Sequence, residues 1–216
     1  MIIIEPYYKI LTPISEGGVN ELRRIEEAAR TCYKSSNDTG DIQKTKDLVK
    51  RLIDSGHEAM LEHSQLSVKF VCDRGVSHEI VRHRLCSFAQ ESTRYCNYSK
   101  AKFNSGITVI SPSWHTDNCS EAVTQAYLAW FSSCLKAEAK YLEMLKCGLT
   151  PQQARGVLPT SLKTEIVVTG NYREWRHMLK LRTAKDAHPD IRLLMCPLLK
   201  ELKEKLPIIF DDIEEE

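Results

Sequence analysis

Apolar residues recur at helical spacing in three long stretches of the chain. Between Asn20 and Cys32, and again between Ile42 and Ile53, apolar side chains return every three or four residues, which predicts two amphipathic helices. The second helix should stop at Gly56. The same spacing from about Ser120 to Lys146 predicts the longest helix, ended by Gly148. Its predicted apolar face consists of Val123, Tyr127, Trp130, Cys134, Ala137, Tyr141 and Leu145.

Other segments alternate apolar with polar residues or are rich in β-branched residues, as strands are. Residues Gln65 to Cys72 alternate in this way, which predicts a half-buried strand. After it, Asp73-Arg74-Gly75 is predicted to be a turn, and Ser77 to cap a helix from about His78 to Arg84. Three more strands are predicted at Met1–Thr12, Ile107–Ile110 and Thr164–Thr169.

Capping residues predict three further helices in the second half of the chain. The first starts at Pro151, and the second at Asn171, where Glu174 completes a capping pattern. The third follows Pro189 and is predicted to be interrupted near Pro197. Helices outweigh strands, and no repeat or linker marks a second domain. The expected fold is α/β (α+β): a single domain over residues 1–210, with one mixed central sheet covered by helices, followed by an acidic tail at 211–216.

Charge and cysteine content narrow the class of protein. The formal net charge of +1 argues against a broad nucleic-acid-binding surface, which is usually strongly basic. The tail holds five acids, so residues 1–210 carry about +6, a balance that suits small phosphorylated ligands in local pockets. The tail itself is expected to be a solvated, frayed end.

The eight cysteines include no Cys-x-x-Cys pair and no zinc spacing, and neither a signal peptide nor a run of transmembrane length is found. We therefore expect a cytoplasmic protein with free thiols, with no metal, no membrane and no nucleic acid as a partner.

The segment Arg82–Tyr95 holds the densest chemistry, with three arginines, a histidine and several hydroxyls. Guanidinium and hydroxyl donors at short spacing suit a phosphate and a planar ring better than a core. The segment is predicted to begin on a helix, where Arg82 and Arg84 would point to different sides, and to leave it into a loop around Ser87–Ser92. An exposed basic helix face would explain Arg-His-Arg alone, but the later Ser92-Thr93-Arg94-Tyr95 argues against it.

A second cluster occupies Gly170–Arg182. Arg173 and His177 lie four apart and share a helix face, and a helix start near Asn171 offers unpaired N–H groups to an anion or a ring carbonyl. The alternative for this cluster is a solvent-exposed basic face.

A third cluster contains His57 and His63, which lie six apart and so face nearly opposite sides of a helix; a zinc site is therefore not expected. No glycine-rich phosphate loop and no Gly-x-Ser-x-Gly elbow occurs. Any flavin or nucleotide must therefore be held by side chains and helix ends.

In their order along the chain, these motifs resemble those of the flavin-dependent thymidylate synthases. Arg-His-Arg at 82–84, followed by Ser92 and Arg94-Tyr95, is similar to the family's signature. The likeness continues at His57-Glu58, in the Ala-Arg-x-x-Leu-Pro segment 154–159, and at Asn171-x-Arg173 with Leu181-Arg182.

The resemblance implies reductive methylation of dUMP to dTMP. 5,10-Methylenetetrahydrofolate would be the carbon donor, FAD the hydride carrier and NADPH the reductant. The family pattern also implies an α/β homotetramer with active sites shared between subunits.

The resemblance also implies roles for single residues. Arg182 would be the catalytic residue, stabilising an anionic uracil ring, and Ser92, Thr93, Arg94 and Arg155 would hold the phosphate. The implied dUMP-binding set is Glu79, Arg82, Gln90, Glu91, Ser92, Thr93, Arg94, Arg155 and Arg182. The implied FAD-binding set is His57, Arg82, His83, Arg84, Gln90, Asn171, Arg173 and His177. Since this chemistry needs no enzyme thiol, Cys86 is expected to be a packing residue.

Four positions depart from the family pattern and bear on individual flavin contacts. Cys32 stands where a serine is frequent, and Ala59 occupies the place of a threonine. Glu79 replaces a neutral amide, and His177 lies where an asparagine can occur.

Two other functions are left open: a non-catalytic nucleotide or nucleic-acid binding module, and a metal-dependent hydrolase built on His57 and His63.

Overall fold

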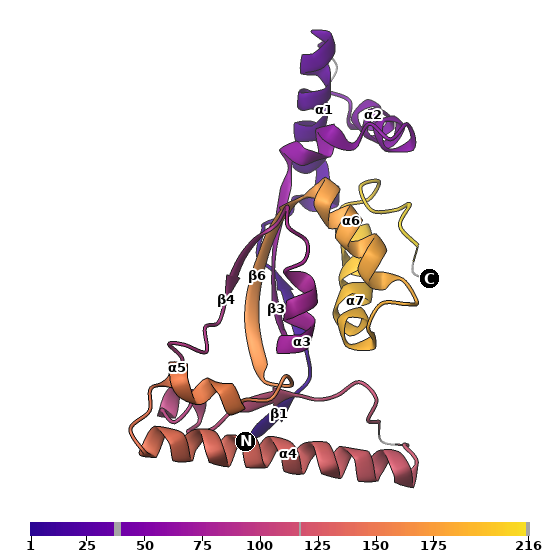
Figure 1. Ribbon diagram of the computed structural model, residues 1–216. Coiled ribbons are helices and arrows are strands. Elements are labelled where there is room, and N and C mark those ends of the chain that lie inside the picture. Colours follow the sequence, from indigo (N-terminus) through magenta and orange to yellow (C-terminus); the bar gives the residue numbers. More distant parts are fainter. Residues whose placement is uncertain (37–39, 117, 215–216) are drawn as a thin grey trace. The chain divides into compact units, whose positions relative to one another are not determined.

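The computed structural model describes residues 1–36, 40–116 and 118–214, and the chain divides into two compact units (Figure 1). The first unit comprises residues 1–7, 70–82 and 89–167, and the second the described residues of 8–69, 83–88 and 168–216. A four-stranded sheet has the order β2 (Tyr7–Ile10), β3 (Gln65–Asp73), β6 (Lys163–Asn171) and β4 (Ser87–Gln90). The predicted α/β class is confirmed; a second sheet has two strands.

The first unit is built around the long helix α4 (Glu121–Lys146), which is visible at full length in Figure 1. Strands β1 (Ile2–Ile4) and β5 (Thr108–Ile110) pair in parallel, and α5 (Pro151–Ala154) and the 3₁₀ helix η4 (Arg155–Val157) pack on α4. One apolar cluster fills this unit and consists of Tyr98, Ile107, Val109, Cys134, Tyr141, Ala154 and Leu162. Another 3₁₀ turn, η3, spans Ala101–Phe103.

Helix α3 (Arg74–Ile80) begins four residues earlier than predicted. The Asp73 carboxylate accepts the backbone N–H of Val76 at 2.7 Å, so Asp73 is the N-cap and the predicted turn at Asp73-Arg74-Gly75 is wrong. Ser77 is not a cap either, because its hydroxyl donates to the carbonyl oxygen of Arg74 at 2.9 Å. The acid that ends strand β3 is therefore the residue that starts the helix, and not the later serine.

The second unit contains most of the helices. Helix α1 (Val19–Tyr33) packs against α2 (Ile42–Asp54) and the 3₁₀ helix η2 (Glu58–His63), and α6 (Tyr172–Thr183) packs against η2 and α7 (Pro189–Lys205). A short turn, η1 (Glu16–Gly18), precedes α1 and contacts α7. The core side chains with no exposed surface include Leu22, Ile25, Val49, Trp175, Met178, Leu179 and Leu198.

The end of the chain differs from its prediction in two ways. Helix α7 continues through Pro197 as one helix, so the predicted interruption is wrong. The acidic tail is not frayed in its described part: Ile213 is buried, and Asp212 Oδ2 accepts from Arg176 Nη2 at 2.7 Å. Glu215 and Glu216 lie outside the described residues.

Candidate active site

Thr93 and Arg155, both predicted to hold the phosphate of dUMP, meet in the first unit. Arg155 is exposed at the start of η4, and its Nη1 donates to Oγ1 of the buried Thr93 at 3.3 Å. Both residues line a cavity of about 320 Å³ that we call the phosphate-side cavity; its other walls come from α3 and the segment 156–162. The fold thus brings together two residues that are 62 positions apart in the sequence.

Ser92 and Arg94 shape the turn that follows β4. The Ser92 carbonyl accepts from the backbone N–H of Tyr95 at 3.1 Å, and its hydroxyl oxygen accepts from the N–H of Arg94 at 3.3 Å. The exposed Arg94 side chain donates from Nε to Gln152 Oε1 at 3.1 Å, with its guanidinium 5.3 Å from the centre of the Tyr95 ring. Ser92 and Arg94 are not among the residues that line the phosphate-side cavity.

Gln90 and Glu91, at the end of β4, have partners within the protein. Gln90 Nε2 donates to Ser77 Oγ at 2.8 Å. The Glu91 carboxylate accepts from the Tyr98 hydroxyl and from Lys163 Nζ, each at 3.0 Å. These contacts fix the backbone that leads into the Ser92 turn.

The two outer arginines of the signature, Arg82 and Arg84, are exposed. Because α3 ends at Ile80, they lie in a turn, and the prediction that they project from two sides of a helix is wrong. The Arg82 N–H donates to the carbonyl oxygen of the half-buried Glu79 at 3.2 Å.

The middle residue of the signature, His83, lies in the second unit and contacts Arg182. Only 4% of its surface is exposed, and its Nε2 accepts from Arg182 Nε at 3.1 Å. Its Nδ1 lies 3.5 Å from Oε1 of the buried Glu174, and the His177 ring stands edge-on at a centroid distance of 5.9 Å. The four side chains form what we call the His83 cluster.

Burial, the charge of Arg182 and the neighbouring His177 lower the pKa of His83 from 6.5 to about 4. His83 is therefore neutral at neutral pH. Because Nε2 accepts from Arg182, the ring proton is on Nδ1, on the side of Glu174. A neutral ring with this tautomer can orient the Arg182 guanidinium through its Nε edge.

Three predicted FAD-binding residues, Asn171, Arg173 and His177, line one cavity of about 640 Å³ along α6 in the second unit. Asn171 caps α6 by accepting the N–H of Glu174 at 2.9 Å, as predicted. The exposed Arg173 pairs with Glu62 at 2.6 Å. We call this the α6 cavity, and Leu85 from the signature also lines it.

His57 lines a different cavity of about 370 Å³, next to α1 and η2. Cys32 and Ala59, two of the positions that depart from the family pattern, lie in its wall together with Tyr33. Arg173 lines both this cavity and the α6 cavity. The residues present suit a flavin dinucleotide, because cationic and amide donors stand beside aromatic and apolar side chains.

Cys86 behaves as the packing residue that the sequence predicts. It is buried, and burial together with the Glu174 charge raises its thiol pKa to about 12. A Cβ added at Gly170 would lie only 2.8 Å from the Cys86 sulfur. A glycine at position 170 therefore lets the backbone of β6 pack closely against Cys86.

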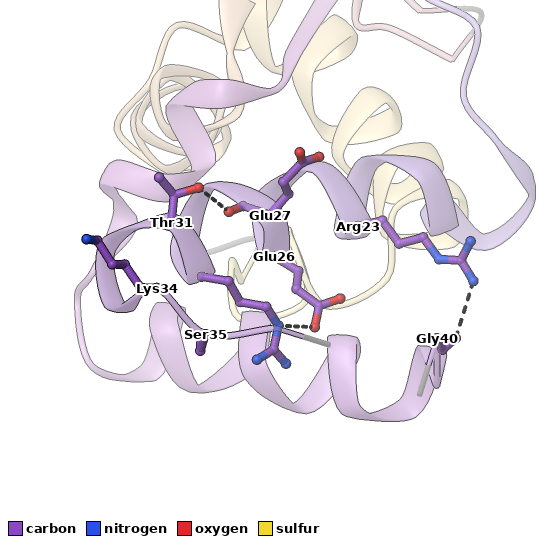
Figure 2. Close-up of a pocket in the computed structure, with 8 residues that line it drawn as sticks. Arg23, Glu26, Glu27, Thr31, Lys34, Ser35 and Gly40 are labelled. Carbon is purple, nitrogen blue, oxygen red and sulfur yellow. Dashed lines mark hydrogen bonds and ion pairs between the residues drawn. The ribbon is translucent and has the colours of Figure 1, made fainter. Parts of the chain in front are cut away.

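A further cavity of about 690 Å³ lies along α1 and is shown in Figure 2. Three of its charged side chains have partners within the protein: Glu26 accepts from Arg30 at 2.7 Å and from Thr45 at 2.5 Å, and Arg23 donates to the Gly40 carbonyl at 3.4 Å. None of the residues predicted to bind dUMP or FAD lines it.

Sequence reasoning missed three residues that the geometry places in these groups. Glu174 was predicted only as part of a helix cap, although its carboxylate reaches His83. Arg74 and His78 were assigned to a turn and a helix face, although both line the phosphate-side cavity. The signal available was their spacing of four, which puts both on one side of α3 once the helix start is known.

In the part of the chain that the structure describes, no three His, Cys, Asp or Glu side chains gather as a metal site would require. None of the helices there has the length and hydropathy of a membrane-spanning segment.

Known proteins resemble this chain over nearly its whole length. Residues 19–208 match the family model described as thymidylate synthase complementing protein. The flavin-dependent thymidylate synthase of Mycobacterium tuberculosis (strain H37Rv) is 33% identical over 201 residues, covering 88% of this chain and 78% of the relative. That of Corynebacterium aurimucosum is 31% identical over 205 residues, covering 92% and 82%.

The fold is also found among solved structures. The UMP/dUMP methylase PolB from Streptomyces cacaoi, bound with 5-Br dUMP, superposes with a TM-score of 0.81 at 20% identity, covering 98% of this chain and 96% of that chain. Together with the sequence matches, this defines an α/β enzyme of the methyltransferase class. The chain belongs to the flavin-dependent thymidylate synthase family.

Proposed function

We propose that this enzyme converts dUMP to dTMP by reductive methylation. 5,10-Methylenetetrahydrofolate would donate the carbon, FAD would carry the hydride, NADPH would be the reductant, and tetrahydrofolate would be released. The observation that carries the proposal is Arg182 held by the neutral, buried His83 in a chain whose family match spans residues 19–208.

The phosphate of dUMP would bind at Thr93 and Arg155. A guanidinium and a buried hydroxyl already in contact are preorganised donors for a phosphate, and charge-assisted hydrogen bonds of this kind are the stronger ones. Ser92 and Arg94 would add donors from the adjoining turn. Glu79, Arg82, Gln90 and Glu91 complete the proposed nucleotide-binding set.

Arg182 would lie against the uracil ring and stabilise its anionic form, which activates C5 towards the methylene group. His83 fixes the Nε edge of the guanidinium and thereby its plane. Since His83 is neutral, its ring does not repel the guanidinium of Arg182.

Residues of the second unit would hold FAD. His57, His83, Arg84, Asn171, Arg173 and His177 belong to the proposed set, with Arg82 and Gln90. Hydride for the reduction would come from the bound FAD after its reduction by NADPH. Arg173 would exchange its contact with Glu62 for the cofactor's anionic group, which costs little because both side chains are largely exposed.

We further propose a cytoplasmic homotetramer with shared active sites. Helix α4 supports this, because Leu128 and Leu135 are 51% and 40% exposed along it. Large exposed apolar side chains on one long helix are typical of a surface that associates with another copy. In such an assembly Arg155 and Arg182 of one active site can come from different copies.

The test is mass-spectrometric detection of dTMP after mixing purified protein, FAD, dUMP, methylenetetrahydrofolate and NADPH, with an NADPH-free control. We expect Arg182→Ala to lower turnover by at least roughly 100-fold while FAD stays bound, as expected for loss of a transition-state donor. Arg51→Ala, an exposed arginine on α2, is the matched control. Absence of dTMP from folded, FAD-loaded protein would favour a non-catalytic nucleotide-binding module.

A further inference from the structure

Glu174 is a buried acid of the His83 cluster to which the proposed reaction gives no role. It lies in the first turn of α6, where its N–H donates to the Asn171 side chain, and only 6% of its surface is exposed. Its Oε1 lies 3.5 Å from Nδ1 of His83. Removing a carboxylate from water is costly unless it is paired, so its place in the core needs a reason.

The partner of Glu174 differs from that of another buried acid in the same unit. Glu26 accepts from the Arg30 guanidinium, a charged donor, at 2.7 Å. Glu174 faces an imidazole whose pKa is lowered to about 4 by burial and by the charges of Arg182 and His177, so the ring is neutral at neutral pH. A carboxylate gains less from a neutral ring than from a guanidinium. A buried acid in this position, despite the smaller gain, is typical of a functional site.

Glu174 and Arg182 lie at opposite nitrogens of the same ring. The Arg182 Nε–H donates to Nε2 of His83 at 3.1 Å, and the carboxylate lies on the Nδ1 side. With the ring proton on Nδ1, the N–H of the ring faces the carboxylate and its lone pair faces the guanidinium. With the proton on Nε2, the lone pair would face the carboxylate and the N–H would face another donor. Both charges therefore favour the same tautomer.

We propose that Glu174 is a positioning residue, which fixes the tautomer of His83 and thereby the hydrogen bond that orients Arg182. This inference rests on the proposed function for the role of Arg182. The tautomer of a histidine is set by the partner of its second nitrogen, and a buried carboxylate is well suited to this task. Without the carboxylate, the Nδ1 proton would lose this acceptor inside the protein. The other tautomer, whose Nε2 cannot accept from Arg182, would then become populated.

Steady-state turnover of dUMP by the FAD-loaded enzyme tests this role. Glu174→Leu keeps the approximate size of the side chain and removes the carboxylate. We expect kcat to fall about 10-fold, with the KM for dUMP within about twofold of wild type. Glu174→Gln, whose carbonyl oxygen can still accept, should recover most of the loss. Glu204→Gln, which removes an exposed acid on α7, is the control for loss of charge.

A second comparison shows whether Glu174 acts through His83. In a His83→Gln background, Glu174→Leu should change kcat by less than about twofold, because the ring that transmits its effect is gone. An equal loss in both backgrounds would overturn the inference, since Glu174 would then act by another route, such as packing. Unchanged kcat in Glu174→Leu alone would overturn it as well.

Nitrogen-15 NMR of histidine-labelled, FAD-loaded protein reads the tautomer directly, and the His83 signals are those missing from His83→Gln. We expect the ring proton on Nδ1 in wild type and a mixture of tautomers in Glu174→Leu. A proton on Nε2 in wild type, or an unmixed Nδ1 form in the variant, would overturn the inference. Thermal unfolding and the FAD absorbance spectrum show whether each variant is folded and loaded. Because this readout needs no turnover, missing dTMP in wild type would refute the proposed function and leave the tautomer comparison valid.

Discussion

Protonation of His83 should destabilise the folded protein. The ring is buried, and its pKa is lowered from 6.5 to about 4 by burial first and then by the charges of Arg182 and His177. A proton on this ring would add a positive charge next to a guanidinium and remove the acceptor that Nε2 offers to Arg182.

The magnitude follows from the two pKa values. In the unfolded chain His83 should titrate near 6.5, and in the folded chain near about 4, so between these values the unfolded state binds the extra proton. The contribution to stability is complete above the unfolded pKa and is lost as the pH falls through this window. At about pH 5 the loss from this one group is about 2 kcal/mol relative to about pH 7.5.

The assay is urea unfolding of wild type and His83→Gln at about pH 7.5 and about pH 5. Glutamine can still accept from Arg182 but does not titrate. The free energy of unfolding of wild type should fall by about 2 kcal/mol more than that of the variant over this interval, since all other groups titrate in both proteins. Equal pH dependence in the two proteins would refute the lowered pKa.

Two stability predictions concern other contacts of the second unit. Arg176→Met should lower the free energy of unfolding by about 1–3 kcal/mol, because it leaves the buried carbonyl oxygen of Ile209 without its donor. Arg173→Met removes an exposed ion pair and should lower it by less than about 1 kcal/mol; urea unfolding distinguishes the two variants. Gly170→Ala should lower the free energy of unfolding by about 1–3 kcal/mol, because the added methyl group would clash with the Cys86 sulfur. Adding Cys86→Ala to this variant should restore most of the lost stability. Gly156→Ala, which has no neighbour within 4 Å, is the control.

Local patterns in the sequence were sufficient for most of the fold. Helices α1, α2 and α4 follow from apolar spacing, and Asn171 caps α6 as predicted. The start of α3 could not be chosen by spacing, because Asp73 and Ser77 are both good caps and only the end of the buried strand β3 decides between them. Pro197 was overestimated as a helix breaker, since burial of α7 residues on both sides of it outweighs one lost backbone hydrogen bond.

The candidate site was predictable as a set of residues but not as geometry. The motifs identified Arg155 and Thr93, yet their contact spans 62 residues and no local rule gives it. Likewise, Arg74 looks like an ordinary turn residue until the fold places it in a cavity without carboxylates. Charges buried by tertiary structure leave no periodic signal, so such residues are found only from coordinates.

The His83 cluster connects stability with the proposed chemistry. The ring of His177 stands edge-on to that of His83, and the electrostatic interaction with His177 helps to lower the pKa of His83. The cluster can therefore hold Arg182 only while His83 stays neutral with its proton towards Glu174. Acidification would remove both the acceptor for Arg182 and part of the folding free energy. Because Arg182 is the proposed catalytic residue, one buried ring would then set the acid limit of both stability and turnover.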